Sequence, residues 1–175
     1  MVGAAFLIVV GLIATNVLRI STIRTSAMEP TLHCGKPGAG CLGSEDDRIA
    51  VLSFVFSSPK RGDIVAFRMP PKAARACGAG GVSVKRIVAV PGETWSERNG
   101  IVTIDGVKLH EPYVKAAERD HASYPRRKLG PGRFFVMGDN RAGSCDSRRF
   151  GTVPRGSLLG TVVATYWPPS RISLR

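Results

Sequence analysis

An uncharged apolar run at the start of the chain limits the possible folds more than any other feature. Residues 2–18 carry no charge and are mostly Val, Ile, Leu, Ala, Gly and Phe. As a helix the run would span about 25 Å, the short end of what crosses a bilayer. A cleavable signal peptide fits less well, since no Lys or Arg precedes the run and no clear cleavage site follows. A soluble core helix would need a polar face. We therefore predict one membrane anchor over residues 1–20 and an extramembrane domain over residues 21–175.

After the anchor, short apolar runs alternate with Gly and Pro, which is typical of an all-β domain. Residues 99–113 indicate a hairpin, because Asp105-Gly106 can supply the positive φ angles of a tight turn. Residues 70–81 are predicted as a loop, and 115–132 as an irregular surface excursion or mobile loop. Helix beyond the anchor should be scarce. Further strands are predicted over residues 48–56, 63–69, 82–90, 133–137 and 157–166.

The net charge of +12 favours anionic partners, either nucleic acid or acidic lipid headgroups. The anchor favours the headgroups, so a membrane is expected and nucleic acid is not. Within the basic stretch 115–133, Arg126, Arg127 and Lys128 are predicted to lie against the headgroups.

Four cysteines bear on the compartment of the domain. Four cysteines allow three pairings, and the sequence does not choose among them. We prefer Cys34–Cys41, which brackets a Gly/Pro loop, together with Cys77–Cys145. Buried free thiols are the alternative, and a zinc site at His33 and Cys34 lacks the usual ligand spacing. Disulfides would place the domain in an oxidising, extracytoplasmic compartment, although Arg19 and Arg24 after the anchor favour the cytoplasm.

Four motifs carry the chemistry, and they occur in one order along the chain. These motifs are Met28-Glu29-Pro30-Thr31-Leu32, Arg61 to Phe67 (RGDIVAF), Val84 to Glu93 (VKRIVAVPGE) and Met137 to Arg148 (MGDNRAGSCDSR). Together they resemble the type I signal peptidases, Ser/Lys-dyad proteases that remove signal peptides from exported preproteins. The resemblance covers nearly the whole extramembrane chain. It implies a coiled, barrel-like antiparallel β-domain on one membrane anchor, with no metal or cofactor.

The resemblance assigns Lys85 as the general base. A lysine acts as a base only when neutral, yet at its reference pKa only about one molecule in 2,500 is uncharged at pH 7. Burial among apolar groups disfavours the ammonium and lowers the pKa. Lys85 is the only lysine in the apolar run 84–90, which supplies such a setting. A solvent-exposed lysine is the alternative.

Other roles follow from the same resemblance. Ser144 would orient Lys85 through a hydrogen bond, and Asp146 would pair with Arg148 and Arg86. The alternative for the 138–148 motif is a well-capped turn. Thr25 would help form the oxyanion hole. Candidate substrate-pocket walls are Met28, Leu32 and Val84, for which ordinary core packing is an equally good account.

The same alignment puts Ala27 where the family carries its nucleophilic serine. A methyl group cannot attack a carbonyl, so this chain is expected to be inactive. Ser26 is one residue out of register and should point to the opposite side of an extended segment. Either the serine was replaced on purpose, or the chain is a natural pseudo-enzyme that still binds signal peptides. Rival readings are a binder of signal peptides or anionic lipid, a self-cleaving repressor domain, and a pilin-maturing relative.

Overall fold

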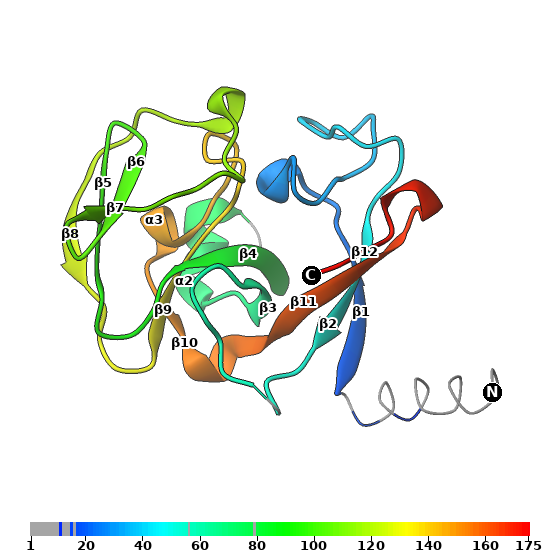
Figure 1. Ribbon diagram of the computed structural model, residues 1–175, viewed down its shortest axis with the longest axis horizontal. Coiled ribbons are helices and arrows are strands. Elements are labelled where there is room, and N and C mark those ends of the chain that lie inside the picture. The colour runs from blue at the N-terminus through cyan, green and yellow to red at the C-terminus, as the bar shows by residue number, and fades with distance from the viewer. Residues whose placement is uncertain (1–10, 12–14, 16, 56, 79) are drawn as a thin grey trace.

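The computed structural model describes residues 11, 15, 17–55, 57–78 and 80–175. Within these ranges the named strands form two antiparallel sheets. The smaller lies on the left in Figure 1 beside β9, while β1, β2 and β11 of the larger lie on the right. The larger sheet has the order β1-β2-β11-β3-β4-β9-β10, with β12 paired to β11, and the smaller has the order β7-β6-β5-β8. The mostly β, antiparallel fold is therefore confirmed.

The strands are two to ten residues long, and the two α-helices have seven and four residues. The strands are β1 (Leu18–Thr22), β2 (Arg48–Leu52), β3 (Ile64–Arg68), β4 (Val82–Ala89), β5 (Thr94–Arg98), β6 (Ile101–Ile104), β7 (Val107–Lys108), β8 (Tyr124–Lys128), β9 (Arg133–Met137), β10 (Val153–Pro154), β11 (Leu158–Trp167) and β12 (Ser173–Leu174). The helices are α2 (Pro71–Cys77) and α3 (Ser147–Phe150), with 3₁₀ turns η1 (Ser26–Met28), η2 (Ala116–Glu118), η3 (Arg155–Ser157) and η4 (Pro169–Arg171).

Two predicted loops contain regular structure. Residues 71–77 form α2, which begins with Pro71 and ends at Gly78 in the left-handed conformation, a pairing that suits helix ends. Tyr124–Lys128 forms β8, which pairs with β5. The loop assignments for these residues were therefore wrong. The predicted 99–113 turn is confirmed, since Asp105 and Gly106 have φ angles of 52° and 87°.

Most of the predicted anchor, residues 1–20, lies outside the described residues. Leu18–Thr22 pairs with β2 as strand β1, so the sheet begins at the end of the predicted anchor. No helix among the described residues has the length and apolar character to cross a bilayer.

Side chains from β4 and β9 join the two sheets. Phe135 stacks on Trp95 of the small sheet with ring centroids 4.1 Å apart, and Val88 and Met137 lie in the same buried cluster. On the other face of the large sheet, Val65, Phe67 and Ile87 pack with Phe150 of α3. Lys85 is buried, and β4 is buried on both faces over residues 87–89 that follow it, so this lysine lies beside apolar surroundings.

Candidate active site

A cavity of about 420 Å³ lies where β4 approaches the segment from β1 to η1. On one edge of β4, residues Val82 to Arg86 pair with β3. On the other edge, the pairing with β9 begins only at Arg86, so the cavity adjoins a stretch of β4 that β9 does not cover. The lining includes Thr25, Ser26, Ala27, Met28, Ser83, Val84, Lys85, Gly143 and the Cys77–Cys145 disulfide.

Lys85 reaches this cavity with little exposure to solvent. Its side chain is 4% exposed, and Nζ donates to Ser83 Oγ at 3.3 Å and to the Val84 carbonyl at 3.1 Å. Burial lowers the pKa of the amine from 10.5 to about 8, against the opposing effect of the Asp146 and Asp139 carboxylates. About one molecule in ten would then be neutral at pH 7.

Asn140 holds the turn at residues 26–27 through its backbone and its side chain. The Ala27 carbonyl accepts from Asn140 N at 3.3 Å, and Asn140 Nδ2 donates to the Ser26 carbonyl at 3.2 Å. Gly138 permits this approach, because a Cβ there would lie 2.4 Å from the Ala27 carbonyl oxygen and 2.3 Å from Ser144 Oγ. Ala27, directly before the first motif, is thus in contact with the fourth motif.

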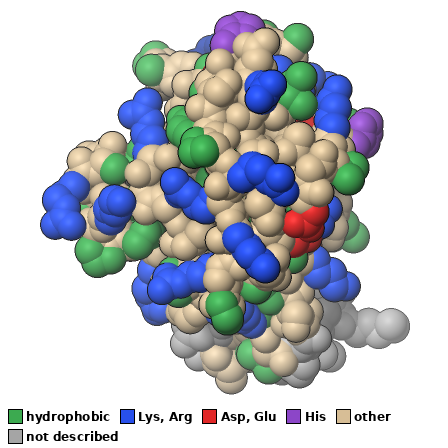
Figure 2. Space-filling view, turned by 90° about the vertical axis from the view of Figure 1, so that its left-hand side faces the viewer, with side chains coloured by type: hydrophobic (Ala, Val, Ile, Leu, Met, Phe, Trp, Pro, Cys, Tyr) green, Lys and Arg blue, Asp and Glu red, His purple; other side chains and the backbone are tan. Residues whose placement is uncertain are grey.

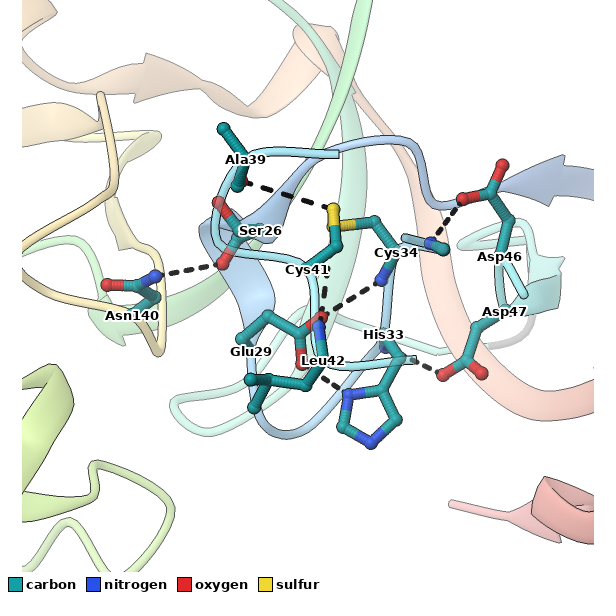
Figure 3. Close-up of a disulfide and its surroundings, with 11 residues drawn as sticks. Ser26, Glu29, His33, Cys34, Ala39, Cys41, Leu42, Asp46, Asp47 and Asn140 are labelled. Atoms are coloured by element: carbon teal, nitrogen blue, oxygen red, sulfur yellow. Dashed lines mark hydrogen bonds and ion pairs between the residues drawn. A yellow bond between two sulfur atoms is a disulfide. The ribbon is translucent and has the colours of Figure 1, made fainter. Parts of the chain in front are cut away.

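The loop closed by the Cys34–Cys41 disulfide covers the turn on another side (Figure 3). Fully buried Glu29 accepts hydrogen bonds from Cys34 N and Leu42 N at 3.1 Å and 3.0 Å, and it also bonds His33 Nδ1. Ser26 lies against Gly40 of this loop, where a Cβ would be 3.0 Å from Ser26 Oγ. Both disulfides follow the preferred pairing, Cys34–Cys41 and Cys77–Cys145.

The fourth motif forms one of the two expected ion pairs, between Asp146 and Arg148. Asp146 pairs with Arg148, whose Nη2 lies 2.8 Å away, and also accepts from Gly138 N at 3.1 Å. Arg86 instead pairs with Asp139, so the predicted Arg86–Asp146 pair was wrong. The physical reason is the register, which places Arg86 opposite Met137 and therefore near the turn that follows β9.

The remaining candidates divide between the cavity and the core. Thr25 is exposed and extended at the start of η1, while Met28 and Val84 line the cavity. Leu32 is fully buried in a core cluster with Met28. Ser144 Oγ is buried, and it has no hydrogen-bond partner among the described residues, so the expected Ser144–Lys85 bond is not formed. Within the described ranges, no cluster of His, Cys, Asp or Glu side chains could hold a metal ion.

Comparison with known proteins decides the family. Residues 1–167 match the family described as "Signal peptidase, peptidase S26". The chain belongs to this family of signal peptidases. Probable signal peptidase I-1 of Synechocystis sp. is 35% identical, over 85% of this chain and 71% of that protein. Signal peptidase I of Mycobacterium tuberculosis is 36% identical, over 90% and 67%. A crystal structure of a signal peptidase I from Enterococcus faecalis shares 32% identity over 60% of this chain and 97% of that chain, with a TM-score of 0.49.

The family resemblance drawn from four motifs is therefore confirmed, and with it the serine endopeptidase class of this signal peptidase. The sequence reasoning missed Ser83, Asp139 and Asn140 as neighbours of the site. Asp139 and Asn140 stand in the fourth motif, but Ser83 precedes the third motif. Its position two residues before Lys85 on a strand places both side chains on one face, which was the available signal.

Proposed function

We propose that this chain binds the small-x-small end of signal peptides in the Lys85 cavity, and that Ala27 occupies the nucleophile position of a Ser/Lys protease. The observation that carries the proposal is the buried Lys85 amine, with its lowered pKa, in one cavity with Thr25 and Ala27. A buried lysine with such a pKa, facing a cavity, has the properties of a general base.

With serine at position 27, each catalytic group would have a defined task. The hydroxyl would lose its proton to Lys85 Nζ and attack the scissile carbonyl, while Thr25 Oγ1 and the residue 27 N–H would donate to the oxyanion. Lys85 would return the proton to the leaving amine and then activate water for hydrolysis of the acyl-enzyme. Alanine supplies no attacking oxygen, so this route is closed in the present chain. The position of Ser26 against Gly40 argues against rescue by that neighbour.

The unpaired edge of β4 supports peptide binding as an added strand. An extended peptide there could bond to the backbone of residues 82–85, and its alternate side chains would enter the cavity. Met28 and Val84 would form the pocket walls, with Leu32 behind Met28 in the core. Neither the backbone bonds to β4 nor the pocket walls need the side chain of residue 27, so peptide binding would survive in this chain.

Restoring the serine tests the proposal. We expect Ala27→Ser to cleave a preprotein or a peptide ending in Ala-x-Ala before the cut, at a rate at least about 100-fold above the parent. The restored hydroxyl supplies the attacking oxygen, and its activation by the general base alone contributes about that factor. The matched control, A27S with Lys85→Met, should remain at background. The parent chain should bind the same labelled signal peptide. A folded A27S chain that binds but never cleaves would favour the pure binding protein, and absence of binding would overturn the proposal.

We propose further that the chain is a single-pass cell-membrane protein with its domain on the extracytoplasmic side, as the disulfides support. The face with the small sheet carries many Lys and Arg side chains (Figure 2), and Arg126, Arg127 and Lys128 on β8 are exposed. Replacing all three by Gln should weaken binding to phosphatidylglycerol vesicles by roughly 100-fold, at about 1 kcal/mol for each charge. The control triple of Lys60, Lys72 and Arg75 removes equal charge elsewhere. Equal losses from both triples would contradict headgroup contact by β8.

A further inference from the structure

The Cys77–Cys145 disulfide forms part of the wall of the Lys85 cavity, and we propose that it determines which middle residue of a bound peptide the cavity accepts. Both cysteines line the cavity, together with Met69. Cys145 belongs to the fourth motif, directly after Ser144, whereas Cys77 is the last residue of α2. The disulfide therefore attaches a short helix to the motif beside the lysine, at the border of the space where a peptide would lie.

The register of β4 shows which face of the strand the disulfide covers. Phe67 of β3 lies opposite Ser83 of β4, and residues directly opposite each other in an antiparallel pair have their side chains on the same face. Phe67 belongs to the core cluster against which Cys77 and Met69 pack. The disulfide and Met69 therefore lie on the face of β4 that carries Ser83.

The opposite face of β4 has different neighbours. Val84 points the other way on the strand and packs against the cluster that includes Ile23 and Met28. A peptide added at the free edge continues the alternation of β4, so its side chains lie on the two faces in turn. With the two small residues of a small-x-small segment on the Val84 face, the middle residue x lies on the Ser83 face, against the disulfide and Met69.

The wall on the Ser83 face favours an apolar side chain of limited size. The sulfur atoms of a disulfide and of a thioether are only weak hydrogen-bond acceptors, so they suit an apolar neighbour. The disulfide joins segments that are 68 residues apart, and this part of the wall therefore cannot turn aside as a single side chain can. A leucine at x gains contact with the wall, whereas a tryptophan has to displace it, at a cost like that of overpacking a core.

This inference rests on the proposed function, because it concerns the peptide that the cavity binds. The probes are labelled signal peptides that differ only at x and end in Ala-Leu-Ala, Ala-Ser-Ala or Ala-Trp-Ala. In the parent chain the leucine peptide should bind about tenfold more tightly than the serine peptide, since burial of the larger apolar side chain stabilises the complex. It should exceed the tryptophan peptide by a similar factor of about ten, because of the overpacking. Fluorescence anisotropy measures the three affinities.

Two variants widen this wall independently. Cys77→Ala combined with Cys145→Ala removes the cross-link, whereas Met69→Ala keeps the cross-link and shortens its neighbour. Each should bring the affinity for the tryptophan peptide to within about threefold of that for the leucine peptide, because the wall then leaves room for the larger ring. Val84→Ala, on the opposite face of β4, is the matched control. It should leave the ratios among the three peptides within about twofold of the parent values, since changes at independent sites act separately.

The outcomes separate this inference from the proposed function. Equal affinities of the parent chain for the three peptides would overturn the role of the disulfide. A folded disulfide-free variant with the parent's ratios would overturn it as well. If the disulfide-free variant does not fold, unchanged ratios in Met69→Ala decide against the wall. Failure of the parent chain to bind any of the three peptides would instead overturn the proposed function, and this inference with it.

Discussion

Arg86 donates two hydrogen bonds to one carboxylate, from Nε to Asp139 Oδ1 at 2.9 Å and from Nη2 to Asp139 Oδ2 at 2.6 Å. Asp139 is fully buried and also accepts from Thr31 Oγ1 at 2.5 Å. The pair therefore joins three motifs that lie far apart in sequence: the turn at residues 28–32, the base strand, and the turn after β9. Arg86 follows Lys85 directly, so this junction fixes the strand that carries the base.

We expect Asp139→Asn to destabilise the fold by about 3 kcal/mol, because removing one charge of a buried pair leaves Arg86 without its counterion. Urea unfolding followed by fluorescence measures this difference. The matched control is Asp63→Asn, whose side chain accepts one bond, from Lys60 N. Equal losses of unfolding free energy in the two variants would contradict a special role for the Arg86–Asp139 pair.

The C-terminal segment, residues 168–175, supports the turn at residues 28–32. This segment lies outside the region that matches the family, which ends at residue 167. Arg171 forms two hydrogen bonds with fully buried Asp47, at 2.8 Å and 3.0 Å. Asp47 in turn accepts from His33 N at 2.9 Å. The segment therefore braces the chain directly after Leu32.

Arg171→Gln should cost about 1–3 kcal/mol, since hydrogen bonds to charged groups contribute that much and the side chain is partly exposed. The same substitution should also increase the hydrogen-exchange rate of the His33 amide. Arg175→Gln is the comparison, because Arg175 donates to Thr31 O and Thr165 Oγ1 and forms no ion pair with a carboxylate within the described part of the chain. Unchanged exchange at His33 in the Arg171 variant would argue against a brace.

Glu97 predicts a pH-dependent stability. The side chain is buried, and both carboxylate oxygens lack hydrogen-bond partners among the described residues. Burial raises the pKa of Glu97 from 4.5 to about 7, with Arg148 opposing the shift. The folded state then holds a proton that the unfolded state releases, so its contribution to stability is lost as pH rises from about 4.5 to 7.

Glu97→Gln should therefore stabilise the fold at pH 8, by about 1–3 kcal/mol, and the advantage should shrink toward pH 4.5. Thermal unfolding at both pH values measures the change, with Glu118→Gln on η2 as a partly exposed control. An equal effect of Glu97→Gln at the two pH values would contradict a buried carboxyl that titrates near 7.

Local sequence signals predicted a large part of the fold. Arg133–Met137 was predicted with its observed bounds, and the Asp105-Gly106 turn required only local backbone chemistry. Strand β8 was missed because its residues, Tyr-Pro-Arg-Arg-Lys, include a proline and three cations. It is formed by pairing with β5, which lies about 30 residues away in sequence. Helix α2 was missed because two prolines precede its Ala residues and a Gly-rich stretch, residues 78–81, follows them, a composition that indicates a loop.

The candidate site was predictable where one motif carried the signal. The apolar run around Lys85 predicted its burial, which the structure shows. The partner of Arg86 was not predictable, because it depends on the register between β4 and β9. Asp139 and Asp146 are both acidic members of one motif, and only the fold distinguishes them.

The central claim is that Lys85 supplies a neutral amine at physiological pH. The most direct measurement is an NMR titration of Lys85 Nζ in the chain as it stands. We predict a midpoint for Lys85 of about 8, since burial disfavours the ammonium. A Lys85 midpoint near 10.5, the ordinary value of a lysine amine, would contradict the account.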